Sequence, residues 1–334
     1  MSVLSQSESS RRERIVPLVL DHMIWPILLV TLIVAGFLVP DLFRNFRSFE
    51  LVLYSSVPLG LLVLAESVCL LSGHFDLSIG AIAGFSAVFT GMLVGGCTNC
   101  WSLIGNPYLA IGIILLVGGF IGFLNGVMIA KLNVNPFLQT LAFLIIFSGA
   151  KTALTTRPVG DLPAGYLFLG RNSMYAIGLM VAVFLLFAFI MRYTSFGQSV
   201  YAVGSSEKSA RAVGVNTDRV IIMVYVISGV LAGLAGLMLT GYSTIVPPDI
   251  AENMVFPAFA AAVIGGVSLF GGRGRISGAL GGVLLLGIVQ SALQLSGIAA
   301  AQIEMAEGMV LLVAILLYNF KEDIRSRILA GETA

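Results

Sequence analysis

Charged residues are scarce in this sequence. Asp, Glu, Lys and Arg make up 10% of its 334 residues, whereas an average soluble domain carries roughly 25%. So little charge cannot cover a water-facing surface, which excludes an ordinary soluble protein. The net charge is +1 and no basic stripe is present, so we expect no nucleic-acid partner.

The motifs of soluble enzymes are also missing. The sequence contains no G-x-x-x-x-G-K-[ST] phosphate loop, no H-E-x-x-H zinc motif and no G-x-S-x-G nucleophile motif. These absences argue against a hydrolase or an oxidoreductase, and they mean that the chain has no ATP-binding loop of its own. We therefore expect no catalytic residue, no metal site and no cofactor.

Only three cysteines are present. Cys69 lies inside an apolar run, where a small buried hydrophobe is the expected role. Cys97 and Cys100 form a single C-x-x-C pair in a short loop, whereas a structural zinc site needs four ligands. The sequence alone leaves three interpretations of this pair, which are loop cysteines without a function, a local disulfide, and a metal-binding pair.

Long apolar runs fill most of the chain. Hydrophobic residues make up 58% of it, and a bilayer core about 30 Å thick needs roughly 20 apolar residues in a helix. Ten such runs predict an all-α, polytopic membrane protein with about ten transmembrane helices. They centre on residues 23–39, 51–72, 79–96, 108–130, 137–154, 174–191, 220–241, 254–270, 276–297 and 303–319. The run 254–270 contains Pro257 and a Gly-Gly pair, which predict a discontinuous helix.

The basic residues predict the orientation, because cytoplasmic loops accumulate Lys and Arg. With the N-terminus inside, 13 of the 18 basic residues fall on cytoplasmic segments and five fall outside. Ten spans then place both termini in the cytoplasm. The predicted organisation is a cytoplasmic tail (1–20), a transmembrane domain (21–320) with a cytoplasmic loop (193–218), and a second cytoplasmic tail (321–334).

Within that cytoplasmic loop the sequence predicts a short polar helix. Residues 206–213 combine good helix formers with a leading serine, and Gly214 follows as a stop signal. This helix could dock onto a partner or be a solvated connector. The loop residues alone do not decide between the two.

A few ionisable residues lie within or beside the apolar runs. Glu66 is well inside the second run, where an acidic side chain costs roughly 2.5–3.5 kcal/mol, so it either makes a polar contact between helices or lines a solute path. Glu304 and Glu307 share one face of the last helix and could simply be solvated. The Pro-rich stretch 245–253 could gate a pathway or form an ordinary turn.

The sequence contains a weak internal echo. Residues 72–84 align with residues 271–282 through matching Gly and Ser positions. Both stretches join one predicted helix to the next on the cytoplasmic face, so the two copies would run in the same direction. Pseudo-repeat halves of this kind are a recurring design of transporters.

Four ordered motifs resemble one known family, the ribose-type permeases of ABC importers. The stretch 72–80 resembles the family's "GGIDLSVG" signature, with Gly73, Asp76, Ser78 and Gly80 at matching positions. The other motifs are Asn135-Pro136-Phe137 with Thr140-Leu141, Ala202-Val-Gly-x5-Ala210-x3-Gly214, and Val263-Ile-Gly-Gly-Val-Ser-Leu-Phe-Gly-Gly-x-Gly. The resemblance extends from about residue 51 to residue 317. His74-Phe75 departs from the family's Gly-Ile.

The resemblance implies a homodimeric permease in the cell (inner) membrane that holds the transport path. A periplasmic or extracellular sugar-binding protein would dock outside, and a cytoplasmic ABC ATPase with two nucleotide-binding domains would dock inside. The segment that would meet the ATPase contains Ser205, Glu207, Lys208, Ala210, Arg211 and Gly214. Our candidates for the solute path are Glu66, Phe137, Gln139 and Gln290.

Other functions stay open on the sequence. Related permeases carry nucleosides or branched-chain amino acids and share this architecture. An ion-coupled secondary transporter would need a carboxylate inside the membrane, for which Glu66 is the candidate. A passive channel has little support. The sequence favours import of a monosaccharide or a similar small polar solute, and it does not identify that solute.

Overall fold

The computed structural model describes residues 23–42 and 44–330, so the predicted tail 1–20 and the last four residues lie outside the described chain. The described residues are almost entirely helical, and their only β pairing is an isolated bridge between Val159 and Val246. The all-α class is therefore confirmed for the part of the chain that the structure describes.

Each of the ten predicted runs contains one long or medium helix. These are α2 (Ile24–Leu38), α3 (Phe46–Leu71), α4 (Ile79–Val94), α5 (Pro107–Leu132), α6 (Pro136–Leu154), α8 (Ser173–Tyr193), α11 (Thr217–Ser243), α12 (Val255–Ile264), α13 (Ile276–Leu295) and α14 (Ala300–Ala330). Six of them are long and apolar enough to cross a membrane, namely α3, α5, α6, α8, α11 and α13. The total of about ten crossings stays a prediction.

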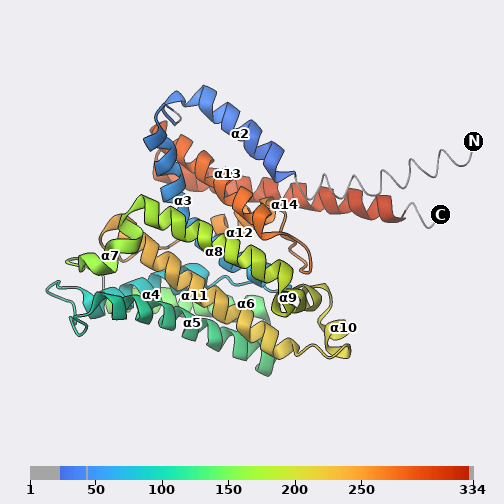
Figure 1. The fold of residues 1–334 in the computed structure, drawn as a ribbon, viewed down its shortest axis with the longest axis horizontal. Helices are drawn as coiled ribbons and strands as arrows, with labels where there is room; N and C mark the ends of the chain where they lie inside the picture. The colour runs from blue at the N-terminus through green and yellow to red at the C-terminus, as the bar shows by residue number, and fades with distance from the viewer. Residues whose placement is uncertain (1–22, 43, 331–334) are drawn as a thin grey trace, which may run out of the picture.

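The remaining elements are the short α7 (Ala164–Arg171), α9 (Ser195–Ser205), α10 (Glu207–Ala212) and the 3-10 turn η1 (Pro40–Leu42). α7 lies at one end of the bundle, and α9 and α10 lie at the other (Figure 1). We call these the α7 end and the α10 end. The N-terminal end of α2 and the C-terminal end of α14 both point toward the α10 end (Figure 1). The last helix is longer than predicted. α14 continues through residues 321–330, which the sequence analysis assigned to the cytoplasmic tail 321–334.

Glycines bring α5 and α11 into backbone contact. A Cβ atom on Gly118 would overlap the carbonyl oxygen of Gly229, and one on Gly126 would lie 2.7 Å from the Cα atom of Ile222. Without side chains on these faces the two helices pack at the distance that lipid-embedded helices favour. The repeated glycines of α5 and α11 therefore serve helix packing.

α12 is a half-length helix that ends just before the Gly-Gly pair at which the sequence predicted a discontinuity. Its ten residues span about 15 Å, which is half of a bilayer core. Its first residue lies against the start of α4, because a Cβ atom on Gly80 would lie 3.0 Å from the carbonyl oxygen of Ala251 and 3.7 Å from the backbone nitrogen of Val255. α4 and α12 therefore begin at the same place inside the bundle and run to opposite ends.

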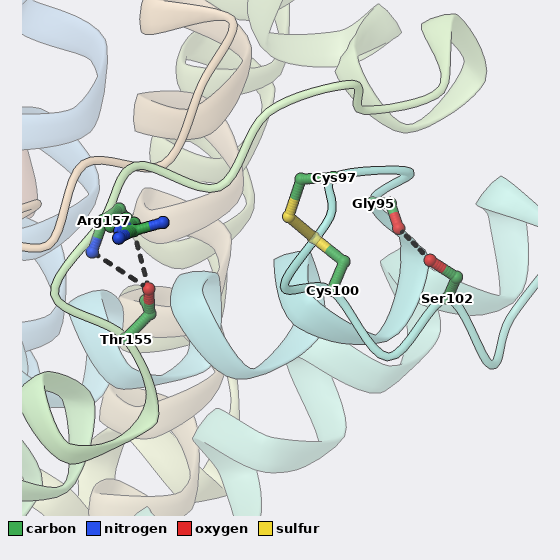
Figure 2. Close-up of a disulfide and its surroundings, with 6 residues drawn as sticks. All are labelled: Gly95, Cys97, Cys100, Ser102, Thr155 and Arg157. Carbon is green, nitrogen blue, oxygen red and sulfur yellow. Dashed lines mark hydrogen bonds between the residues drawn. A yellow bond between two sulfur atoms is a disulfide. The ribbon is translucent and has the colours of Figure 1, made fainter.

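A disulfide closes the loop after α4. Figure 2 shows the bond between Cys97 and Cys100, beside the hydrogen bond that the Ser102 hydroxyl donates to the Gly95 carbonyl at 2.6 Å. The same view includes the neighbouring loop, where the backbone nitrogen of Arg157 donates to the Thr155 hydroxyl at 3.1 Å. Of the three interpretations that the sequence left open for this pair, the structure contains the local disulfide.

Candidate solute path and coupling loop

A buried polar network surrounds the signature loop 72–78. One carboxylate oxygen of Asp76 accepts hydrogen bonds from the backbone nitrogen (3.0 Å) and the hydroxyl (2.5 Å) of Ser78, and the other accepts from the Ser228 hydroxyl at 2.8 Å. The Asn125 amide donates to the Ser78 hydroxyl at 2.9 Å, and the Gln139 amide lies 3.4 Å from the Asn125 oxygen. The network ties the loop between α3 and α4 to α5, α6 and α11.

Glu66 occupies a different environment. Its side chain is 1% exposed, and neither carboxylate oxygen has a hydrogen-bond partner among the described residues. It interacts electrostatically with Asp76. An ionised carboxylate in such a place is costly, so Glu66 stands out among the buried side chains that the structure describes.

A cavity with polar and apolar lining residues lies between α3, α11, α12, α13 and α14. We call it the Gln290 cavity; its volume is about 330 Å³. Its polar lining residues are Ser55, Tyr242, Glu252, Asn253, Gln290, Gln294, Glu304 and Glu307. The lining contains three carboxylates and three side-chain amides, and none of its residues is Lys, Arg or His. Such groups can exchange hydrogen bonds with hydroxyls, and they disfavour an anion.

A second cavity lies on the other side of the turn that precedes α12. We call it the Lys151 cavity; its volume is about 350 Å³, and it shares Glu252 and Asn253 with the Gln290 cavity. The Lys151 side chain is 4% exposed, and its ammonium nitrogen lies 3.3 Å from the Ile250 carbonyl oxygen and 3.9 Å from a carboxylate oxygen of Glu252. Lys151 thereby ties α6 to the turn that separates the two cavities.

The four candidates for the solute path do not line a common cavity. Gln290 lines a cavity, whereas Glu66 and Gln139 are buried and line neither cavity. Phe137 is 50% exposed at the start of α6. Sequence reasoning missed Gln294, although it follows Gln290 by four residues and therefore lies on the same helix face.

The predicted loop helix is present as α10. The Ser206 hydroxyl accepts from the backbone nitrogen of Ser209 at 3.2 Å, as an N-cap does. Arg211 bridges Glu207 (2.9 Å) and Asp218 (3.0 Å), so the helix is tied to the start of α11. The sequence prediction missed α9, the helix immediately before α10.

The surface of this loop separates into buried and exposed positions. Ala210 is buried, and Gly214 has a φ of +89°, which a residue with a side chain rarely adopts. Ser205, Glu207 and Lys208 are exposed. Val213 is 80% exposed, so α10 presents an apolar side chain together with charged ones.

His74 occupies the position at which this sequence departs from the family signature. Its Nδ1 lies 2.8 Å from the Ser72 carbonyl oxygen, and its ring meets Tyr225 edge-on at 6.2 Å between centroids. Burial lowers the pKa of His74, and the Ser72 carbonyl and the charge of Glu207 oppose this effect. The imidazole is therefore neutral at pH 7.

Residues 48–318 match the family described as the permease component of the branched-chain amino acid transport system. The chain belongs to this family. It is 35% identical over 266 residues to the ribose import permease protein of Bacillus subtilis (strain 168), a match that covers 77% of this chain and 80% of the relative.

Other relatives match more of the permease. It is 32% identical over 311 residues to an L-arabinose ABC transporter permease protein of Azospirillum brasilense, covering 91% of this chain and 88% of the relative. It is 30% identical over 305 residues to the ribose import permease protein of Escherichia coli (strain K12), a match that covers 88% of this chain and 92% of the relative. No solved structure matches the chain. The permease is a multi-pass protein of the cell (inner) membrane, and its relatives are transport components.

Proposed function

We propose that this permease is the membrane subunit of an ABC importer that moves a monosaccharide into the cytoplasm. The relatives named above are import permeases for ribose and L-arabinose. A separate ATPase would drive alternating access, because a partner that binds one conformation more tightly shifts the population toward it. Permeases for branched-chain amino acids or nucleosides are the nearest alternative.

The Gln290 cavity is the observation that carries the proposal. Its amides and carboxylates can pair with the hydroxyls of a sugar, and its volume of about 330 Å³ is in the range of small-ligand sites. It lies beside α12, a half-length helix, and transporter sites typically form where membrane helices are broken. A neutral polyol fits this lining better than a sugar phosphate or a sugar acid, because the lining contains carboxylates and lacks basic residues.

The orientation of the bundle is part of the proposal. We assign the α10 end and both termini to the cytoplasm, in agreement with the distribution of Lys and Arg. The Cys97–Cys100 disulfide lies in the loop before α5, whose first residue, Pro107, lies against Gly165 of α7. Disulfides persist in oxidising compartments outside the cytoplasm. The α7 end would therefore meet the sugar-binding protein.

The partners follow from the same orientation. α10 would dock onto a cytoplasmic ATPase with two nucleotide-binding domains, through its exposed charges and Val213. Two copies of the permease would form a homodimer, so that each nucleotide-binding domain meets one α10. The path residues Glu66, Phe137 and Gln139 remain proposals beside Gln290.

An uptake assay tests the cavity. The permease is reconstituted with its ATPase and binding protein, and uptake of radiolabelled D-ribose, L-arabinose and D-fructose is measured. We expect Gln290→Leu to reduce uptake at least tenfold, because a buried hydroxyl of the solute would lose its partner. The matched control is Gln302→Leu, an exposed glutamine of α14 that lines neither cavity. Equal uptake by both variants would refute the role of the cavity.

A docking assay tests α10 separately. Ala210 is buried and Gly214 needs a positive φ, so bulky residues at either position would disturb the loop itself. Val213→Glu changes only an exposed side chain, and we expect it to abolish co-purification of the ATPase. Gln198→Glu adds the same charge to the exposed face of α9 and should leave co-purification intact. Normal co-purification with Val213→Glu would contradict docking through α10.

A further inference from the structure

Three chain segments meet through glycine backbones at the α10 end. They are the start of the signature loop, the last turn of α9, and the loop 265–275 between α12 and α13. A Cβ atom on Gly271 would lie 2.6 Å from both the Cα atom of Gly73 and the carbonyl oxygen of Gly204. One on Gly204 would lie 2.5 Å from the backbone nitrogen of Gly272. We call these four residues the glycine junction.

Two hydrogen bonds fasten the junction. The backbone nitrogen of Gly272 donates to the carbonyl oxygen of Leu71 at 3.0 Å, which joins the loop 265–275 to the end of α3. The hydroxyl of Tyr201 on α9 donates to the carbonyl oxygen of Gly274 at 2.9 Å. α9 therefore holds the loop 265–275 through a side chain as well as through backbone packing.

Each segment of the junction continues into a functional element. The signature loop leads through Asp76 to α4, whose residues Gly80 and Ala81 line the Lys151 cavity. The loop 265–275 follows α12, whose first turn contributes to both cavities. The last residue of α9 is separated from α10 by Ser206 alone. At the junction, α9, which leads directly to the proposed docking helix α10, thus contacts the two segments that connect to α4 and α12.

We infer that Tyr201 is a positioning residue that couples α10 to the cavities by holding the loop 265–275 on α9. The inference rests on the proposed function, in which an ATPase displaces α10. Because backbones in direct contact cannot shift independently, a movement of α9 carries the signature loop with it. The Tyr201 hydroxyl extends this movement to α12, so that α4 and α12 move together and change access to the cavities.

The test measures ATP-driven access to the cavities and needs no knowledge of the solute. A single Asn253→Cys substitution places a thiol in the lining shared by both cavities. Background labelling of the native cysteines is low because Cys69 is buried and the other two cysteines form a disulfide. The rate of labelling by a maleimide is measured on the permease–ATPase complex, without nucleotide and with ATP plus vanadate.

We expect the ATP-dependent change of the labelling rate to shrink about fivefold in Tyr201→Phe, which corresponds to the loss of one neutral hydrogen bond. Co-purification of the ATPase should stay within error of the parent, and the apparent melting temperature should fall by no more than about 2 °C, the effect of one neutral hydrogen bond in a chain of this length. The matched control is Tyr193→Phe, because this exposed tyrosine at the end of α8 has no hydrogen bond through its hydroxyl among the described residues. A stricter variant is Gly204→Ala, whose methyl group would force the segments apart.

The possible failures are distinguishable. An unchanged ATP response in Tyr201→Phe overturns the inference and leaves the proposed function intact. If Tyr201→Phe loses co-purification and thermal stability together with the ATP response, beyond the small expected fall in melting temperature, Tyr201 is only structural. This result also overturns the inference. If the parent complex does not assemble, or does not respond to ATP, the proposed function itself fails and the coupling role falls with it.

Discussion

Replacing Ser228 with alanine should destabilise the permease by a measurable amount. The Ser228 hydroxyl donates at 2.8 Å to Asp76, and both residues are fully buried. A hydrogen bond to a charged group contributes about 1.5–3 kcal/mol, and an alanine side chain leaves almost no cavity. We therefore expect a loss of about 2 kcal/mol. For a chain of 334 residues that corresponds to a fall of about 3 °C in the apparent melting temperature.

The assay is thermal unfolding of the detergent-solubilised permease, followed by size-exclusion chromatography with fluorescence detection. Ser243→Ala is the matched control because Ser243 is exposed on the same helix and its hydroxyl bonds only to the carbonyl four residues earlier. Surface changes of this kind are usually within ±0.5 kcal/mol. If both variants melt at the same temperature, the buried network does not hold the signature loop to α11, and this reasoning is wrong.

Three further predictions follow. Gly118→Val should destabilise by about 3 kcal/mol or more, since its side chain would collide with α11, whereas Gly112→Val, with open space around it, should be tolerated in the same melting assay. Burial lowers the pKa of His74, so the unfolded chain binds more protons than the folded chain at acidic pH. The free energy of unfolding therefore falls as the pH drops below about 6.5. We expect His74→Gln to lessen this loss of stability between pH 7 and pH 5. An impermeant maleimide should label Cys97 and Cys100 from outside only after reduction, and labelling without reductant would argue against the disulfide.

The helices could be predicted from the sequence because their signals are local. Length and hydropathy placed one run on each of the ten observed helices, although α14 extends to Ala330, beyond its run 303–319. Pro257 and the following Gly-Gly pair indicated an interruption in the run 254–270, and α12 ends just before that pair. α9 was missed because its residues are neither strongly apolar nor marked by a clear stop signal. The cysteine pair stayed undecided because spacing alone does not show whether two sulfur atoms meet.

The candidate site was less predictable because it depends on tertiary placement. The partners Asp76 and Ser228 are 152 residues apart, and no local pattern joins them. A hydropathy profile also does not show which way a helix is rotated, so Glu66 and Gln290 looked alike in sequence. The structure buries the first and places the second in a cavity. The glycine junction likewise depends on three segments that are distant in sequence.

The central claim is that solute moves through this chain by energy from a separate ATPase. The most direct measurement is uptake of radiolabelled D-ribose, L-arabinose and D-fructose into proteoliposomes that contain the permease, with or without its ATPase and binding protein. We predict accumulation of at least one sugar only when both partners and ATP are present. Accumulation driven by a proton or sodium gradient in vesicles that contain the permease alone would contradict the account.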